Sequence, residues 1–472
     1  MADRASHRAG PWGEAWARVV RRPGAACALA WLGVVAFFAA LAPVIASGHP
    51  LVWTQRGADG AARRTFPLVE HLSAWDLVLA VGVPIAAVVL ALPGRALGAT
   101  RGERWRWVVA SGIQAGITVA VCGLARAVLG EASAVTAGVI AAVVGGAGWL
   151  LPIVGRPGAR AVMAVAVALG CVAACHLGSR VPLVDFDRYA QAEASGGATG
   201  VYTLIPWSPG QGRTDWYVKP PGWRVEAERG AASGGGAGGG RVFVLGTDAL
   251  GRDVLSQMLH ACRLSISIGL VSTGIAVAIG VTLGALMGFF GGWVDAVLMR
   301  LVEVVMAIPV LFLLIVAVGV LPTEWRTTHA LMVVIGCVSW TGAARFTRAE
   351  FMKLRGQEFV LAARAAGLPL RSVLGRHILP NAVTPVLVDA SFAVAAAILA
   401  EATLSYLGLG PPEQASWGAL LAGATGTVGD FVWWLAIFPG GAIFLTVLSY
   451  NLVGEALRDA MDPRRRARTD LA

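Results

Sequence analysis

Long apolar runs separated by short polar stretches dominate the chain. Such runs lie at about 25–46, 76–93, 107–128, 133–154, 161–178, 264–290, 294–320, 329–347, 382–407 and 431–452. About 20 apolar residues in a helix cross the hydrocarbon core of a bilayer. The pattern therefore predicts an all-α polytopic membrane protein with about ten transmembrane helices.

Composition supports the membrane assignment and narrows the meaning of the positive charge. The chain is 56% hydrophobic and 14% charged, with a net charge of +10, whereas soluble domains carry about 25% charged residues. Most of the positive charge is arginine, which holds loops on the cytoplasmic side of a membrane. We therefore interpret the basic balance as a topological signal and expect no nucleic-acid partner.

Arginine placement predicts the orientation. Arg18, Arg21 and Arg22 precede the first helix, and later arginines alternate with acidic or neutral loops. The predicted order is a cytoplasmic tail (1–24), a first transmembrane helix (25–47), a periplasmic loop (48–75), an inserted four-helix membrane segment (76–178), a periplasmic segment ending in a surface amphipathic helix (179–262), a membrane core (263–457) and a cytoplasmic basic tail (458–472).

A polar island interrupts the core at 356–381. Helix-favouring residues predict a helix from Leu361 to Ala366, which Gly367 ends. A second short helix follows at about 370–377, after which Pro380 ends it and Asn381 caps the next span. The small residues Ala362, Ala363, Ala366 and Gly367 predict a face that another surface can approach closely, with Arg364, Arg371 and Arg376 around it.

This island resembles the cytoplasmic coupling loop of ABC importer permeases. The resemblance lies in Ala362-Ala363, Gly367 and the run from His377 to Asn381. The family pattern begins Glu-Ala-Ala, whereas Leu361 occupies the Glu place here and Glu358 lies one turn earlier. The resemblance implies ATPase contacts by Glu358, Leu361, Ala362, Ala363, Arg364, Ala366, Gly367, Arg371, His377 and Pro380.

A second motif, Leu-Gly-Thr-Asp-Ala-Leu-Gly-Arg-Asp, begins at Leu245. It resembles the signature of the dipeptide/oligopeptide permease subfamily. Asp248 is expected to cap a turn, Gly251 to adopt positive φ, and Arg252 with Asp253 to pin the surface helix. The residues assigned to this periplasmic signature are Gly246, Thr247, Asp248, Gly251, Arg252, Asp253, Ser256 and Arg263.

Two carboxyl groups lie inside the span at 382–407, where charge is costly and often functional. They are Asp389 and Glu401. The string from Glu401 to Gly410, with Ser416-Trp417-Gly418 after it, also resembles the dipeptide/oligopeptide subfamily. Asp389, Glu401, Ser405 and Trp417 are therefore candidates for the pathway or gate. Glu401 either meets a peptide amine or closes the periplasmic gate, and both interpretations stay open.

The resemblance implies a permease subunit of an ATP-driven importer in the inner membrane of a bacterium, with both termini cytoplasmic. Its implied partners are a second permease subunit, two ABC ATPase subunits that bind ATP and magnesium, and a solute-binding protein. The chain itself has no Walker A lysine and no hydrolase or metal motif, so we expect no catalytic residue, metal or cofactor. The solute stays open among dipeptides, oligopeptides, nickel chelates and sugars.

An ATP-independent secondary transporter or channel is the main alternative. It predicts inverted repeats and function without an ATPase. A membrane-anchored enzyme or sensor would need a catalytic or signalling domain, and the segment 179–262 is short and glycine-rich.

Overall fold

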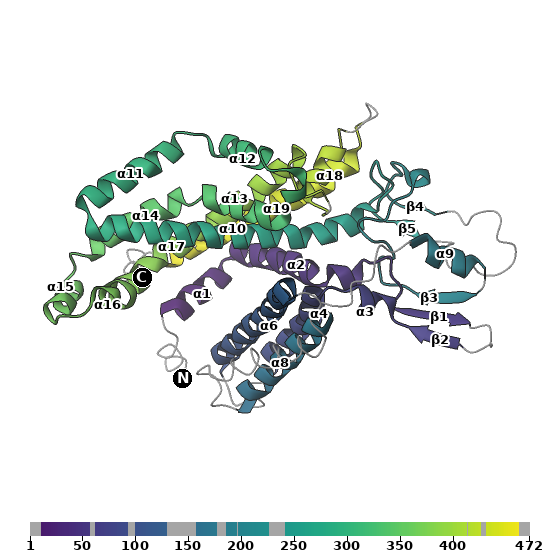
Figure 1. Ribbon diagram of the computed structural model, residues 1–472, viewed down its shortest axis with the longest axis horizontal. Coiled ribbons are helices and arrows are strands. Elements are labelled where there is room, and N and C mark those ends of the chain that lie inside the picture. The colour runs from purple at the N-terminus through teal and green to yellow at the C-terminus, as the bar shows by residue number, and fades with distance from the viewer. Residues whose placement is uncertain are drawn as a thin grey trace. The chain divides into compact units, whose positions relative to one another are not determined.

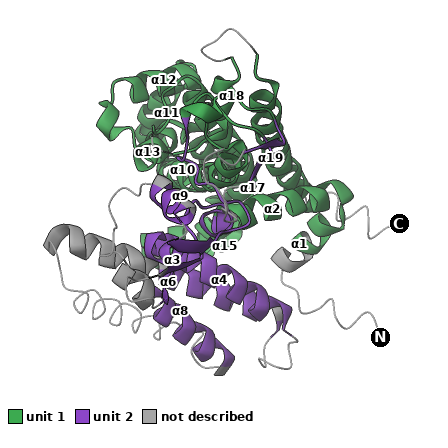
Figure 2. Cartoon of the chain, turned by 90° about the vertical axis from the view of Figure 1, so that its right-hand side faces the viewer, with its two compact units in different colours: residues 1–39, 214–220, 246–472 green, residues 40–213, 221–245 purple. Residues whose placement is uncertain are grey.

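The computed structural model describes residues 11–56, 62–92, 100–129, 157–176, 186–195, 197–225, 241–412, 414–425 and 431–461. The chain forms two compact units (Figure 2). Unit 1 contains residues 1–39, 214–220 and 246–472, and unit 2 contains residues 40–213 and 221–245. The apolar run 133–154 lies outside the described residues, and so does a glycine-rich stretch at 234–240.

Unit 1 is helical. Its elements are α1 (Pro11–Arg21), most of α2 (Pro23–Ile45), η3 (Thr214–Trp216), α10 (Val254–Phe290), α11 (Gly292–Met306), α12 (Val310–Gly319), η4 (Thr323–Trp325), α13 (Thr328–Val338), α14 (Thr341–Leu354), α15 (Glu358–Ala365), α16 (Leu370–Ser372), the π-helix η5 (Val373–Ile378), α17 (Leu379–Tyr406), α18 (Trp417–Gly423) and α19 (Trp433–Met461). The long helix α10 packs along α14, α13 and α17 (Figure 1).

Unit 2 combines helices with small sheets. Its elements are β1 (Val52–Arg56), β2 (Ala62–Thr65), α3 (Pro67–His71), α4 (Ala74–Ala91), α6 (Arg101–Leu129), α8 (Pro157–His176), α9 (Phe186–Ala194), β3 (Ala198–Val201), β4 (Trp223–Arg224) and β5 (Val242–Phe243). Helices α4, α6 and α8 pack against one another. The strand order is β2-β1-β3, all antiparallel, with Trp53 opposite both Thr65 and Gly200.

Local chemistry sets both ends of α4. Ser73 and Asp76 form a reciprocal capping box at its start, which satisfies two backbone donors. At its other end, the buried guanidinium of Arg104 donates to the carbonyls of Val89 and Leu90, both at 3.1 Å. Carbonyls at a helix end have no intrahelical partners, so Arg104 of α6 caps the C-terminal end of α4.

The described residues contain five helices long and apolar enough to span a membrane, or up to seven if two bent pairs count as spans. The expected ten are therefore not confirmed. Of the inserted segment, α4 qualifies, α8 contains a shorter apolar stretch (Gly158–Gly170), and α6 is helical without qualifying. A multi-pass membrane protein is nevertheless the coarse architecture that this pattern supports.

Three helix boundaries differ from the expectation. The run 294–320 bends by 81° between α11 and α12, and the run 329–347 bends by 43° between α13 and α14. Pro309 begins the second half of the first pair, and proline removes a helical backbone donor. The surface helix expected before residue 263 is not separate, because α10 is continuous from Val254 through the span.

Three glycines on α10 hold α14 at short range. Gly280, Gly284 and Gly288 repeat every fourth residue and so share one helix face. A Cβ atom would lie 2.8 Å from the Ala344 nitrogen at Gly280 and 2.5 Å from the Ala344 oxygen at Gly284. Such small-residue repeats let membrane helices bring their backbones together. Replacing any of these glycines must therefore push α14 away.

We predict that Gly284→Leu lowers the free energy of unfolding by at least about 2 kcal/mol, because overpacking a tight contact forces backbone shifts. Thermal unfolding of the purified chain in detergent measures the change. The matched control is Gly274→Leu on the same helix, where no atom lies within 4 Å of an added Cβ. Equal unfolding curves for the two variants would contradict the tight α10–α14 contact.

Candidate functional sites

The polar island folds as two short helices joined at a glycine. Gly367 has φ of +74°, a conformation that favours glycine. The Leu368 amide donates to the Ala363 carbonyl at 3.2 Å, and the Gly367 amide donates to the Arg364 carbonyl at 2.9 Å. This pair of bonds is a Schellman motif, so Gly367 ends α15 as predicted.

A small apolar cluster anchors the island to the rest of unit 1. Ala363 is buried beside Val360, Val373 and Ile378, and Phe351 of α14 belongs to the same cluster. The prediction that Ala363 shares an exposed small-residue face is therefore wrong. A helix turns by about 100° per residue, and the packing against α14 rather than the composition selects which alanines face inward.

The opposite side of the island is exposed and mixes apolar with basic side chains. Phe359, Leu361, Leu368 and Leu370 are between 40% and 52% exposed. The remaining exposed members of the predicted coupling set are Glu358, Ala362, Arg364, Ala366, Gly367, Arg371 and Pro380. Leu361, at the place where the family pattern has Glu, is therefore an outward-facing apolar group.

A π-helix, η5, carries the island into α17. Pro380 has no N–H, and it lies in the first turn of α17 rather than ending a helix as expected. The Leu379 amide bonds the Leu374 carbonyl, a five-residue step. The side-chain amide of Asn381 donates to the His377 carbonyl at 2.8 Å, and the His377 ring contacts the Ser372 carbonyl at 3.0 Å. Asn381 is thus an internal brace of a continuous helix, not a cap.

Three basic residues brace the island against the α10–α11 corner, and of these the sequence singled out Arg364 but not Arg348 or Arg355. Arg364 lies over the Phe289 ring at 4.7 Å from its centroid. Arg355 donates to the Phe289 carbonyl at 3.3 Å. Arg348 on α14 pairs with Asp295 on α11, with Nη2 2.7 Å from Oδ2. The sequence does not predict these contacts, because each arginine and its partner are more than 50 residues apart and no local pattern links them.

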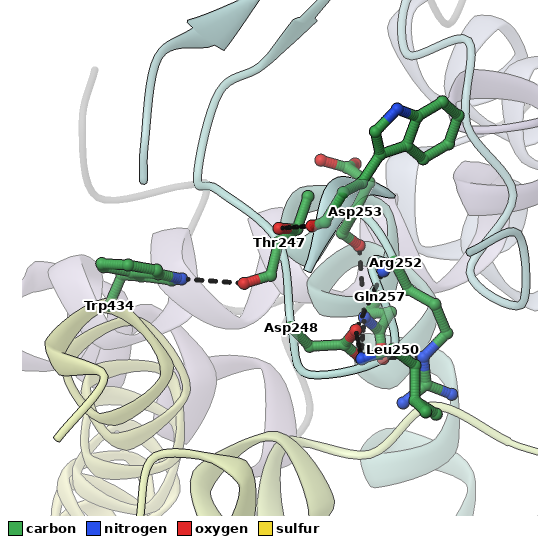
Figure 3. A network of polar contacts seen from close by, with 8 residues as sticks. Thr247, Asp248, Leu250, Arg252, Asp253, Gln257 and Trp434 are labelled. Carbon is green, nitrogen blue, oxygen red and sulfur yellow. Dashed lines mark hydrogen bonds and ion pairs between the residues drawn. The ribbon is translucent and has the colours of Figure 1, made fainter. Parts of the chain in front are cut away.

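The Leu245–Ser256 motif forms a hydrogen-bonded loop at the start of α10 (Figure 3). The Asp248 carboxylate accepts from the amides of Leu250 and Arg252, both at 2.9 Å. It also accepts from Arg252 Nε at 2.8 Å and Gln257 Nε2 at 3.1 Å. Gly251 has φ of +69°. The predicted roles of Asp248 and Gly251 are therefore confirmed.

The neighbouring Thr247 links the loop to other parts of unit 1. Its hydroxyl donates to the Trp216 carbonyl at 2.5 Å and accepts from the Lys219 amide at 2.7 Å. Its carbonyl accepts from Trp434 Nε1 of α19 at 3.1 Å (Figure 3). Gly246 has φ of +81° and lets the chain turn here. Sequence reasoning missed Trp434 and Gln257.

Asp253 begins α10. Its Oδ2 accepts from the Ser256 amide at 2.7 Å, which is the usual N-cap contact. Burial of the carboxyl raises its pKa to about 7, although bonds from the backbone amides of Ser256 and Leu255 oppose the shift. Arg263 lies farther along α10 and is half-buried. The motif is thus a rigid cap that holds α10, α19 and residues 214–220 together.

A pocket of about 270 Å³ opens beside this cap, entirely within unit 1. The lining side chains include Leu250, Arg252, Ser405, Pro411 and Leu420. The Ser405 hydroxyl donates to Glu401 Oε1 at 2.7 Å, and Glu401 itself is fully buried. Ser405 therefore separates the Glu401 carboxyl from the pocket.

The four pathway candidates do not form one site. Trp417 is buried and donates to the Met258 carbonyl at 3.2 Å. Asp389 and Glu401 are twelve residues apart on α17, a rise of about 18 Å. In this structure Glu401 and Trp417 lie in helix packing, whereas Asp389 is half-buried. Among the residues that the structure describes, no group of three potential metal ligands gathers.

Comparisons with known proteins give consistent similarities. The family model described as "Binding-protein-dependent transport system inner membrane component" matches residues 280–467. A putative peptide permease protein of Brucella suis is 44% identical over 224 residues, covering 46% of this chain and 72% of the relative. A di/tripeptide transport system permease protein of Pseudomonas aeruginosa is 36% identical over 262 residues, covering 55% and 81%. A methionine ABC transporter solved in inward-facing conformations covers 44% of this chain and 98% of its own, at 16% identity and a TM-score of 0.35.

We predict that the Asp253 carboxyl makes stability fall as pH rises. An acid with a raised folded-state pKa stays protonated in the folded chain at pH values where the unfolded chain is already ionised. Stability therefore falls as the pH rises from the ordinary pKa of 3.8 to the folded-state pKa of about 7. Between about pH 5 and about pH 7 the wild type should lose roughly 2 kcal/mol relative to Asp253→Asn. The amide keeps the capping contact and does not titrate.

Thermal unfolding of both proteins across that pH range measures this difference. Parallel pH profiles for the wild type and Asp253→Asn would show that the Asp253 carboxyl does not respond to its burial.

Proposed function

Because the chain belongs to the family of binding-protein-dependent transport system inner membrane components, we propose that it forms the pathway for di- or oligopeptides as the permease subunit of an ATP-driven importer. Of the relatives named above, one is described as a putative peptide permease and the other as a di/tripeptide transport permease. Their similarity reaches about half of this chain, so the unmatched part adds features of its own to a shared core.

The observation that carries the ATP-driven part of the proposal is the anchored, exposed island at 356–381. Its inner face is fixed by Val360, Ala363 and Ile378, and its outer face presents apolar groups with arginines around them. A surface of this kind suits a cleft on another protein, since exposed apolar patches rimmed by polar residues mark protein–protein interaction sites. The proposed occupant is a cytoplasmic ABC ATPase subunit.

In the proposed mechanism the island acts as a lever. ATP-driven closure of two ATPase subunits moves α15 and η5, and the Arg348–Asp295 pair together with the α10 glycines carries the movement into the spans. The pathway then exchanges between outward- and inward-open states, a two-state transition that the partner biases. ATP and magnesium are bound by the partner, and this chain supplies no catalytic group.

The remaining partners follow from the same proposal. A second permease subunit completes the pathway, and a solute-binding protein delivers peptide to the opposite end, where Asp248, Arg252 and Thr247 keep the cap rigid. The chain is a multi-pass inner-membrane protein. With the island and both termini in the cytoplasm, the Leu245–Ser256 cap lies on the periplasmic side.

We predict that Ala366→Trp abolishes co-purification of the ATPase subunits, because Ala366 is exposed next to Gly367 and a large side chain there blocks close approach. Ala349→Trp adds the same side chain to an exposed alanine on α14, outside the island, and is the matched control. Affinity purification of each tagged variant from membranes, followed by mass spectrometry, measures the ATPase recovered.

Recovery of ATPase with the wild type and Ala349→Trp, but not with Ala366→Trp, supports the coupling role. Wild-type protein that carries no ATPase, yet takes up peptide into proteoliposomes without ATP, would overturn it in favour of a secondary transporter.

A further inference from the structure

Two opposite charges, Arg345 on α14 and Asp389 on α17, lie away from the island and from the Leu245–Ser256 cap. Asp389 is half-buried on α17, and its Oδ2 lies 3.8 Å from where a Cβ would stand on Gly342, in the first turn of α14. Arg345 lies three residues after Gly342 on α14, slightly less than one turn, and is exposed. Gly342 links the two charges, because the Asp389 carboxyl lies beside it and Arg345 follows it within one turn of α14.

Within the described part of the chain, neither charge forms an ion pair. The structure describes no ion pair between Arg345 and Asp389, and the described residues offer Asp389 no hydrogen bond. The contact that the structure gives Arg345 runs from Nη1 to the thioether sulfur of Met306 at 3.5 Å, and thioether sulfur is a weak acceptor. Charges in membrane segments are rare and normally paired, so these two have capacity to bind something else.

Both charges lie where two bent helix pairs break. Met306 is the last residue of α11, before the 81° bend into α12, and Gly342 follows the 43° bend between α13 and α14. Asp389 is ten residues from the start of α17, about 15 Å along the helix axis. Non-helical backbone at membrane depth is tolerated where it is buried in protein or lines a water-filled cavity. At these breaks Arg345 is exposed and Asp389 is half-buried, so neither side chain is enclosed by the described part of the chain.

We propose that Asp389 and Arg345 form a solute site for a zwitterion, with Asp389 binding the α-ammonium group of a peptide and Arg345 binding its α-carboxylate. The site rests on the proposed function and adds a substrate class to it. A free-ended short peptide carries one positive and one negative terminus, which matches the unpaired charges. An arginine fork suits a carboxylate because two parallel N–H groups meet its two oxygens.

The test measures binding of three probes, Ala-Ala, N-acetyl-Ala-Ala and Ala-Ala-amide, by calorimetry. The protein is the full chain purified in detergent with the subunits that accompany it, and no solute-binding protein is added. Blocking either terminus should weaken binding to the wild type on the order of tenfold, since a charged hydrogen bond contributes about 1.5 kcal/mol or more.

The variants assign each terminus to one residue. Asp389→Asn should bind Ala-Ala and N-acetyl-Ala-Ala equally while still discriminating against the amide. Arg345→Gln should bind Ala-Ala and Ala-Ala-amide equally while still discriminating against the acetylated form. The matched controls Glu303→Gln and Arg300→Gln remove an exposed ion pair on α11 and should keep the wild-type order.

Wild-type protein that binds the three probes equally, or binds none of them, overturns the zwitterion site. So does either variant that keeps the wild-type order. Recovery of ATPase subunits in the same preparation separates these outcomes from failure of the permease proposal, because a wild type without ATPase would count against the importer instead.

Discussion

The close contact between α10 and α14 is the constraint on which the rest of unit 1 depends. Gly280, Gly284 and Gly288 leave no room for a side chain against the α14 backbone. In a bilayer, helices gain little from hiding apolar surface, since lipid is equally apolar, and close backbone packing supplies much of the attraction instead. Because α14 runs straight towards the 356–381 island, the same contact fixes where that island lies.

The two ends of this helix pair have different physical characters. At one end, the island presents exposed apolar and basic side chains on a small buried anchor, which suits a partner that binds and moves it. At the other end, Asp248 and Asp253 accept hydrogen bonds from backbone amides of their own loop, and the Thr247 carbonyl accepts one from Trp434 of α19. Hydrogen-bonded networks of this kind rigidify their surroundings, although Asp253 Oδ1 has no hydrogen-bond partner among the described residues. A movable end and a rigid end are what a lever that acts on a pathway requires.

Local chemistry was predictable from the sequence, whereas long-range packing was not. Gly367 and Gly251 have the positive φ that glycine in a turn indicates, and Asp248 makes the turn contacts expected of it. The inward position of Ala363, the helix bends near Pro309 and Trp340, and the Arg348–Asp295 pair depend on which helices meet, and a single sequence does not encode that in any short window. The α10 glycines were a readable signal, since their four-residue spacing is typical of close helix contacts.

The central claim is that α10 and α14 move as one body that carries the coupling island. Double electron–electron resonance between spin labels at Thr282→Cys and Ala349→Cys, two exposed positions on these helices, tests it in a background that lacks the six native cysteines. The account predicts one narrow distance distribution that is the same in the nucleotide-free and ATP-bound complex. A distance that changes or splits when ATP binds would contradict it.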